Sequence, residues 1–210
     1  MITPLDLTGA RTRRLQNYVC GAWVEGTGKA APLVHAVTGV PFAEASTDGI
    51  DFKRVVEYGR TVGGPKLRAM TFHQRALMLK AMAKYLMERK DEFYRVSAAT
   101  GATKRDGWVD IEGGIGTLFA YASRGRREFP NETFHVEGMT EPLSKGGTFV
   151  GQHICVPIEG VAVHINAFNF PVWGMLEKLA PTLLAGVPAI VKPATLTSFL
   201  TESVFGEMVA

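Results

Sequence analysis

The stretch from Gly160 to Thr195 constrains the fold of this 210-residue chain more than any other segment. Residues 160–165 are mostly apolar and rich in valine, residues 171–184 carry apolar side chains at helical spacing, and residues 189–191 are again apolar. A strand, a helix and a second strand in this order form a parallel pair with a right-handed crossover. The chain is therefore expected to be an α/β protein, with Val161–Ile165 as a buried strand.

The loop between the first strand and the helix, Asn166–Asn169, is a candidate site. Ligands of open α/β sheets bind outside the carboxyl ends of the strands, where this loop lies. Pro171 suits the first helical turn, because its missing N–H would have no partner there. The two asparagines fit a binding site, and they fit equally a loop whose side chains only satisfy backbone groups. From the residues alone, both interpretations stay open.

Composition excludes several classes of protein. With 46% hydrophobic and 20% charged residues the chain has enough apolar material for a core, so intrinsic disorder is not expected. The net charge of +3 is spread along the sequence, which speaks against a nucleic-acid partner. The longest apolar runs are interrupted by Gly, Pro or His and fall short of the ~20 residues that span a bilayer, so no membrane segment is expected. Two cysteines and no signal-peptide pattern favour a cytoplasmic protein.

Upstream of the central stretch the sequence predicts a lead-in over residues 1–15. Residues 16–24 and 33–44 follow and are expected to be short strands of an antiparallel pair. Asp51 is expected to cap a helix that runs to Tyr58 and ends near Gly59 and the Gly63–Pro65 breaker.

The strongest helical signal begins at Thr71, which forms a capping-box pattern with Gln74. An apolar stripe continues to Phe93, so one long helix is expected to end at Thr100-Gly101. A further helix over residues 108–123 contains three glycines. No strand precedes them and no Lys-Ser/Thr follows, so we interpret them as close helix packing and not as a phosphate loop.

Residues 133–136 and 148–156 form two extended segments around a polar, Gly-containing stretch, which predicts a β-hairpin or arm. An exposed strand edge of this kind is usually covered by another chain. We therefore expect the arm to mediate homo-oligomerisation.

The central stretch resembles the aldehyde dehydrogenase superfamily. That family's signature is an aromatic residue and NFP, a helix with K-x-x-P, a Gly turn, and a strand ending in KP. The matching residues here are Phe168, Asn169, Phe170, Pro171, Lys178, Pro181, Gly186, Lys192 and Pro193. Gly21-x-Trp23, Thr38-Gly39 and the helix with Arg75 agree with the family upstream. Residues 100–123 and 165–181 also resemble the bifunctional enzymes of phenylacetate degradation, in which a fused hydratase-like module accompanies an aldehyde dehydrogenase module that oxidises a CoA-linked semialdehyde.

The resemblance implies a fold and a domain plan. Residues 16–133 and 158–210 would be parts of a Rossmann-like coenzyme-binding domain, and residues 134–157 an oligomerisation arm. The family's catalytic domain, with its nucleophilic cysteine and general-base glutamate, would lie downstream of residue 210. The helical pattern of residues 201–210 has no cap, which favours a longer chain. A non-catalytic fragment that binds coenzyme or a subunit, and a CoA-acylating enzyme, stay as alternatives.

The resemblance also implies roles for individual residues. Asn169 matches the family's oxyanion donor, the one catalytic residue expected in this chain. The coenzyme would contact Ile165, Phe168, Lys192, Ala194 and Thr195. Thr195 stands where many relatives have a ribose-binding glutamate, and a neutral residue beside Lys192 admits a 2′-phosphate that a carboxylate would repel. NADP is therefore favoured as the cofactor, with NAD as the alternative.

The helix after Asn169 places four residues on one face, at positions that line the substrate tunnel in the family. They are Phe170, Trp173, Gly174 and Glu177. The two aromatic residues are equally compatible with a place in the core. Glu177 stands where many relatives have an aromatic residue, and two interpretations are open: a solvated helix charge, or a contact with a polar group of the substrate. The expected substrate is a small-molecule aldehyde, either free or linked to CoA.

The remaining reactive side chains are not expected to form sites. Cys20 and Cys155 are predicted to be buried or structural thiols. The five histidines lack metal-ligand spacing, so no metal site is expected. His164 is interpreted as a core histidine with satisfied hydrogen bonds.

Overall fold

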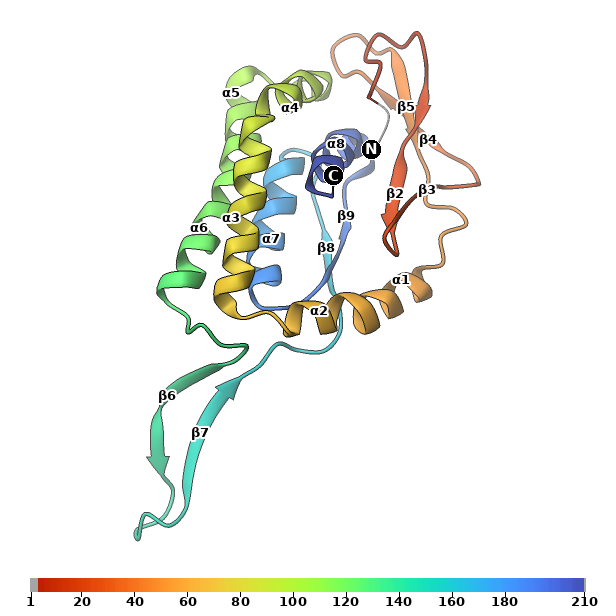
Figure 1. The fold of residues 1–210 in the computed structure, drawn as a ribbon. Helices are drawn as coiled ribbons and strands as arrows, with labels where there is room; N and C mark the ends of the chain where they lie inside the picture. The colour runs from red at the N-terminus through yellow and green to blue at the C-terminus, as the bar shows by residue number, and fades with distance from the viewer. Residues whose placement is uncertain (1–3, 210) are drawn as a thin grey trace.

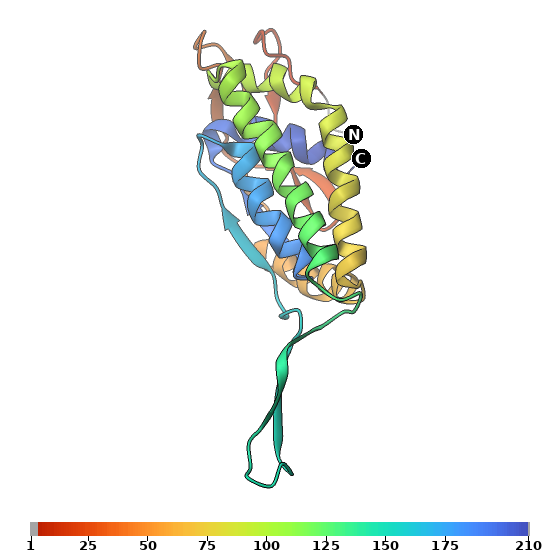
Figure 2. The ribbon, with the colours of Figure 1, turned by 90° about the vertical axis from the view of Figure 1, so that its left-hand side faces the viewer.

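The computed structural model describes residues 4–209 and combines a helical layer, short strands and a projecting hairpin (Figure 1). The helices α3, α6 and α7 lie side by side in two perpendicular views (Figures 1 and 2). The amino-terminal strands lie on the opposite side of α8 and of the β8–β9 pair from these helices (Figure 1).

The amino-terminal strands form two hairpins in separate sheets. β2 (Gln16–Val19) pairs antiparallel with β3 (Ala22–Glu25), and β4 (Ala31–Val34) pairs antiparallel with β5 (Pro41–Ala45). β1 (Arg13–Arg14) adds a parallel edge to β5. The predicted short strands are confirmed, but they form two antiparallel pairs in separate sheets and not the single pair that was expected. The lead-in is less loose than predicted, because Leu5 is buried and Arg13 pairs with Glu202 of α8.

The first helical region is longer than predicted. Asp51 caps α1 (Phe52–Tyr58) by accepting a hydrogen bond from the backbone N–H of Arg54, as expected. The helix does not end at Gly59, because a π-helical segment (Gly59–Gly63) leads directly into α2 (Gly64–Arg68). The wider π turn tolerates the missing N–H and the ring of Pro65, which sits in the first turn of α2.

The long helix predicted after Thr71 is two helices. The capping box of Thr71 and Gln74 is confirmed at the start of α3 (Phe72–Glu88). The backbone breaks at Arg89 (φ −108°, ψ 5°), and α4 (Lys90–Ser97) follows with two acidic residues in its first turn, which favour a new helix start. A 3₁₀ turn (Ala98–Thr100) and Gly101 end the region, as predicted.

The glycine-rich helix starts four residues earlier than predicted and runs further. Thr103 and Asp106 form a second capping box at α5 (Lys104–Gly107), a π-helical segment (Trp108–Glu112) follows, and α6 (Gly113–Arg127) completes the helix. Close packing is confirmed at Gly114, where a Cβ would lie 2.9 Å from the Trp173 Cα of α7. Gly116, by contrast, has no neighbour within 4 Å of such a Cβ.

The predicted strand–helix–strand unit is confirmed. β8 (Ala162–Ile165) and β9 (Ala189–Lys192) pair in parallel, and α7 (Pro171–Leu184) connects them. A 3₁₀ turn (Thr195–Thr197) and α8 (Ser198–Met208) follow. The expectation of a buried strand is wrong for one face, because Val163 and Ile165 are 61% and 73% exposed. Successive side chains of a strand point to opposite faces, and α7 covers the face of His164.

The core lies between α3, α6 and α7. Leu79, Ile115 and Met175 are fully buried there, and each buried side chain of this kind contributes ~1.5–3 kcal/mol to folding. Arg75 is buried as well, and its guanidinium stacks 4.4 Å from the centre of the Phe72 ring. Burial lowers the pKa of Arg75, because the charged form loses its hydration.

The predicted hairpin is confirmed and projects from the body (Figures 1 and 2). β6 (His135–Pro142) pairs antiparallel with β7 (Val150–Cys155). Its apolar side chains are open to solvent, and Met139 is 86% exposed. No helix of the described residues is long and apolar enough to cross a membrane. The division of the chain into domains stays a prediction.

Candidate coenzyme and substrate site

The ends of β8 and β9 bring the predicted coenzyme residues to one edge. Ile165 and Lys192 are register partners at the carboxyl ends of the parallel strands. The backbone N–H of Asn166 extends the pairing by donating to the Lys192 carbonyl over 3.1 Å. Across the two loops, the Thr197 hydroxyl donates to the Phe168 carbonyl over 3.1 Å. These bonds hold the loop after β8 against the segment with Ala194 and Thr195, as a site at a strand edge requires.

The chemistry of this edge suits a dinucleotide. Ile165 and Phe168 are 73% and 60% exposed and offer apolar surface. Lys192 is exposed and forms no salt bridge within residues 4–209, so its ammonium group is free for a hydroxyl or phosphate oxygen. Asn166 is buried, and both its amide nitrogen and its amide oxygen lack a partner there. A buried amide without partners is costly, which is typical of a group that bonds to a ligand or to water.

Asn169 lies in the same loop, just before α7. Its side chain is exposed and makes no hydrogen bond to any other described residue, so the amide N–H₂ is available as a donor. The predicted oxyanion donor thus stands at the amino-terminal end of a helix, where partial positive charge favours a negative ligand.

Asp110 fixes the start of α7, a role that was not predicted from the sequence. Phe170 occupies the N-cap position without a side-chain bond, and Pro171 has no N–H. The Asp110 carboxylate accepts the next two backbone N–H groups, those of Val172 and Trp173, over 3.0 and 2.8 Å. These bonds tie α7 to the π-helical segment of residues 108–112. A single acidic residue between Val109 and Ile111 was the only sequence signal.

The burial of Asp110 has an electrostatic consequence. Its side chain is almost wholly buried, and no cation pairs with it in the part of the chain that is described. Desolvation raises the pKa of this carboxyl to about 6, although the hydrogen bonds from Trp173 and Val172 act in the opposite direction. Asp110 is therefore a helix-capping group whose ionised form is unfavourable in the folded chain.

Three of the four predicted tunnel residues lie together at the start of α7. The rings of Phe170 and Trp173 are 6.3 Å apart, and the Trp173 indole N–H donates to Glu177 over 2.9 Å. Gly113 makes room for this indole, because a Cβ there would lie 3.1 Å from the ring. Gly174 instead lies near Asn166 and Lys178: a Cβ added at Gly174 would be 3.9 Å from the Asn166 side chain and 3.8 Å from the Lys178 Nζ. Glu177 therefore accepts a hydrogen bond from the Trp173 indole, which neither the solvated-charge interpretation nor the substrate-contact interpretation included.

His164 and the cysteines differ from expectation. His164 is buried, and its Nε2 lies 3.1 Å from the Thr182 hydroxyl, but its Nδ1 has no partner, so the core histidine is only half satisfied. Burial, and then the charge of Lys178, lowers its pKa. The prediction of buried thiols is wrong. Cys155 is exposed on the arm, and Cys20 is half-buried in the β2–β3 turn, where its φ of 52° suits a hairpin corner.

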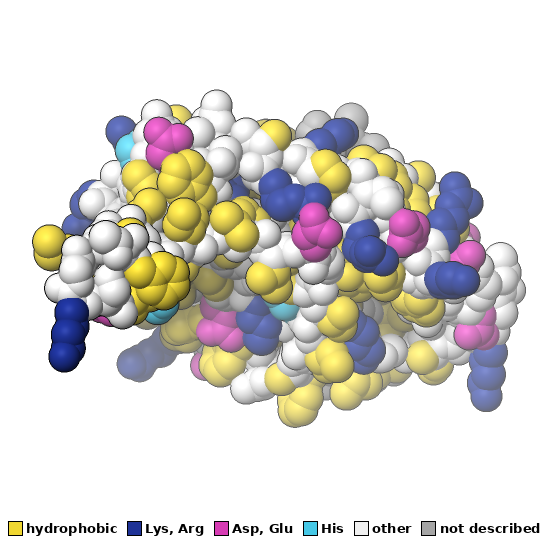
Figure 3. Space-filling view, turned by 90° about the horizontal axis from the view of Figure 1, so that it is seen from below, with side chains coloured by type: hydrophobic (Ala, Val, Ile, Leu, Met, Phe, Trp, Pro, Cys, Tyr) yellow, Lys and Arg dark blue, Asp and Glu magenta, His cyan; other side chains and the backbone are white. Residues whose placement is uncertain are grey.

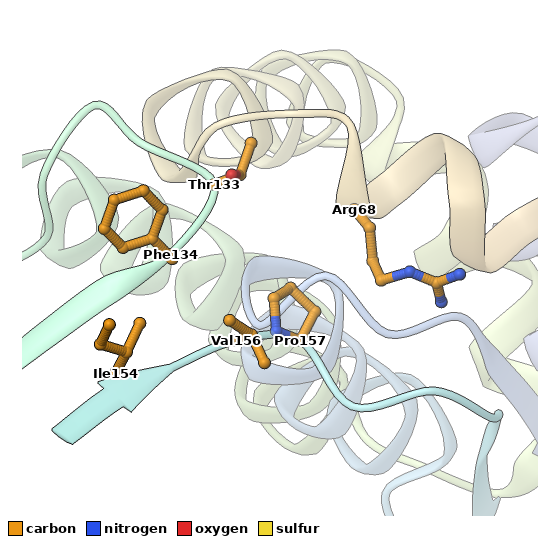
Figure 4. A pocket seen from close by; sticks show the side chains of 6 residues that line it. All are labelled: Arg68, Thr133, Phe134, Ile154, Val156 and Pro157. Atoms are coloured by element: carbon orange, nitrogen blue, oxygen red, sulfur yellow. The ribbon is translucent and has the colours of Figure 1, made fainter.

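Within residues 4–209 no cluster of three or more His, Cys, Asp or Glu side chains has the geometry of a metal site. A cavity at the base of the arm, between α2 and the strands, is lined by Arg68, Thr133, Phe134, Ile154, Val156 and Pro157 (Figure 4). Its apolar lining continues the exposed apolar surface of the arm.

The parallel strand pair, the free amide before α7 and the projecting hairpin together define an α/β protein whose predicted site residues gather at its strand ends. The sequence model of the aldehyde dehydrogenase family matches residues 23–210, and the chain belongs to this family. It is 44% identical over 197 residues to the 3,4-dehydroadipyl-CoA semialdehyde dehydrogenase of Aromatoleum evansii, covering 93% of this chain and 38% of that protein.

Solved structures agree in fold. The Mycobacterium tuberculosis aldehyde dehydrogenase complexed with NAD+ superposes with a TM-score of 0.77 at 24% identity, covering 95% of this chain and 40% of that one. The NADP-dependent glyceraldehyde-3-phosphate dehydrogenase of Bacillus halodurans C-125, complexed with NADP, superposes with a TM-score of 0.72 at 20% identity. This match covers 93% of this chain and 40% of that one. The chain therefore spans about two fifths of the length of these proteins.

Proposed function

We propose that this chain is the amino-terminal portion of an NADP-dependent aldehyde dehydrogenase that oxidises a CoA-linked semialdehyde to the acid. The observation that carries the proposal is the free amide of Asn169, beside the strand edge of Ile165 and Lys192 and at the capped start of α7. In this proposal the nucleophile and the general base belong to the part of the relatives' length that the chain does not span. Ile165, Phe168, Lys192, Ala194 and Thr195 hold the coenzyme, which accepts a hydride when bound.

The chain's own contribution to the chemistry is electrostatic. Attack on the aldehyde carbonyl converts its oxygen to an oxyanion, and the Asn169 N–H₂ donates a hydrogen bond to that oxygen. A preorganised donor of this kind typically lowers the barrier by ~3 kcal/mol. Phe170 and Trp173 present an apolar wall next to Asn169, which limits access of water to the reacting carbonyl.

The test uses the whole polypeptide that the reading frame encodes. We expect NADPH absorbance with a CoA-linked semialdehyde and a carboxylic acid as the product, identified by mass spectrometry. A new thioester formed only when free CoA is added would instead support the CoA-acylating alternative. Failure to reduce NADP or NAD with any aldehyde would reject an enzymatic role.

The coenzyme preference rests on Thr195 beside Lys192. Thr195→Glu is expected to shift the ratio of kcat/KM for NADP to that for NAD about tenfold or more towards NAD, because a carboxylate repels the 2′-phosphate and accepts bonds from the ribose hydroxyls. Steady-state kinetics with both coenzymes measure the ratio. Thr195→Gln is the matched control, since it adds the same bulk without the charge. A Gln variant that shifts the ratio equally would show that size and not charge matters.

The CoA-linked substrate is supported by the relative from Aromatoleum evansii, whose name gives such a substrate and which shares 44% of the aligned residues.

We also infer a homo-oligomer in which the arm pairs with another subunit. The arm's apolar side chains are open to solvent, and they adjoin the apolar cavity at its base. On the face seen from below, apolar side chains are prominent while Lys and Arg are scattered (Figure 3).

Glu177 is expected to act by holding the Trp173 indole. Glu177→Gln keeps an acceptor oxygen for the indole N–H, so kcat/KM for the CoA-linked semialdehyde should stay within about twofold. Glu177→Ala removes the acceptor and should lower kcat/KM by about 2- to 10-fold, as loss of one hydrogen bond allows. If the Gln variant loses as much as the Ala variant, the charge of Glu177 meets the substrate instead.

A further inference from the structure

A second cavity lies apart from the strand edge, between α4 and the π-helical segment before α6. We call it the basic pocket; its volume is about 500 Å³ and its lining is Lys90, Asp91, Tyr94, Lys104, Arg105, Trp108 and Glu112. Ligand pockets commonly have volumes of ~300–1,000 Å³. Neither the coenzyme residues nor the tunnel residues belong to this lining.

Two cations of the basic pocket are unpaired. Lys90 is bound to Glu112 over 3.0 Å, and the Tyr94 hydroxyl donates to the same carboxylate over 2.8 Å. Lys90 and Tyr94 lower the pKa of the Glu112 carboxyl by bonding to it. Burial, together with the bond to Glu112, raises the pKa of Tyr94 to about 12. Lys104 and Arg105 form no salt bridge with any described residue, and both are exposed. The pocket therefore presents two free cations against one free carboxylate, Asp91.

Trp108 adds an aromatic surface beside these cations. Its side chain is 57% exposed, although large aromatic residues are usually buried to a greater degree. An indole face open to solvent is a platform on which a purine base stacks, and neighbouring Lys and Arg side chains bind phosphate oxygens. A flat aromatic face and two cations in one pocket fit a ligand that combines a base with several phosphates.

The basic pocket is connected to the substrate site through one short segment. Trp108 and Glu112 are the ends of the π-helical segment, and Asp110 between them bonds to the backbone of Trp173. Gly113, the next residue, lies under the Trp173 indole. α4, α5 and the start of α7 lie at the same end of the helical layer in both ribbon views (Figures 1 and 2).

We propose that the basic pocket binds the nucleotide end of coenzyme A, with adenine on Trp108 and the phosphates on Lys104 and Arg105. The flexible pantetheine arm then runs over the π-helical segment and delivers the semialdehyde to Asn169. This inference rests on the proposed CoA-linked substrate and assigns the residues that recognise it.

The experiment compares two substrates that differ only in the nucleotide: the CoA thioester of the semialdehyde and the pantetheine thioester of the same acid. In the whole polypeptide, Lys104→Ala/Arg105→Ala is expected to raise KM for the CoA thioester about tenfold, because charge-assisted bonds to phosphate are lost. KM and kcat for the pantetheine thioester should not change. Lys29→Ala/Lys66→Ala removes two exposed lysines outside the pocket and is the matched control.

A second variant is expected to change KM for the CoA thioester in the opposite direction. Asp91→Asn removes the free carboxylate, so KM for the CoA thioester should fall, and the fall should shrink at high salt. The site is refuted if the Lys104/Arg105 variant affects both thioesters equally or neither. A wild-type enzyme that oxidises simple aldehydes but neither thioester would instead refute the proposed substrate class.

Discussion

Replacing Asn169 with Ala in the whole polypeptide is expected to lower kcat for the aldehyde by about 10²- to 10³-fold, the usual effect of removing one oxyanion donor. The amide has no other hydrogen-bond partner in the described chain, so its deletion costs the fold little. KM for the coenzyme should stay within about threefold, because the donor acts mainly in the transition state. Steady-state kinetics and the thermal midpoint, Tm, separate the two effects.

The matched control is Asn169→Asp, which has nearly the same shape but presents an acceptor where the N–H₂ donor was. We expect it to be at least as impaired as the Ala variant, since a carboxylate repels the developing oxyanion. An Asp variant with near-normal kcat would contradict the oxyanion role.

Asp110→Ala is expected to have the second largest effect, a fall in kcat of about 10- to 100-fold without contact with the substrate. The Asp110 carboxylate holds the N–H groups of Val172 and Trp173, and its loss leaves two donors unpaired at the start of α7. The loop with Asn169 then loses its fixed position, and small misplacements of a reacting group can cost about 10²-fold. Asp110→Asn retains an acceptor oxygen and should recover most of the activity.

A double-mutant cycle distinguishes positioning from general destabilisation. If Asp110 acts through Asn169, then Asp110→Ala should lower kcat much less in the Asn169→Ala background than in the wild type. Additive effects, or a fall in kcat that only follows the loss of Tm, would contradict the positioning role.

Asp110 also predicts a pH dependence of stability. Folding raises the pKa of this carboxyl from 3.8 to about 6, so the folded chain binds the proton more tightly than the unfolded chain. The resulting stability is complete below pH 3.8 and is lost as the pH rises through about 6. Relative to Asp110→Asn, the free energy of unfolding of the wild type should therefore fall across this range. Denaturation at several pH values measures it.

Local patterns predicted the elements whose signals lie within a few residues. The capping box at Thr71 and the strand–helix–strand order of residues 160–192 were both correct. The errors arose where packing overrides local preference. The π-helical segment carries the helix past Gly59 and Pro65, and the backbone breaks at Arg89 although the apolar stripe continues.

In the candidate site, too, local sequence patterns predicted some features and only the packing decided the others. The sequence by itself determined its residue types, because Asn169, Lys192 and Thr195 stand at the spacing of a recognisable family. The tertiary structure alone decided that Asp110 caps α7 across 62 residues of sequence, that Gly113 accommodates the Trp173 indole, and that two unpaired cations meet an exposed tryptophan. Contacts between residues so far apart depend on how helices pack, and the periodicity of one segment carries no information about the partner it meets.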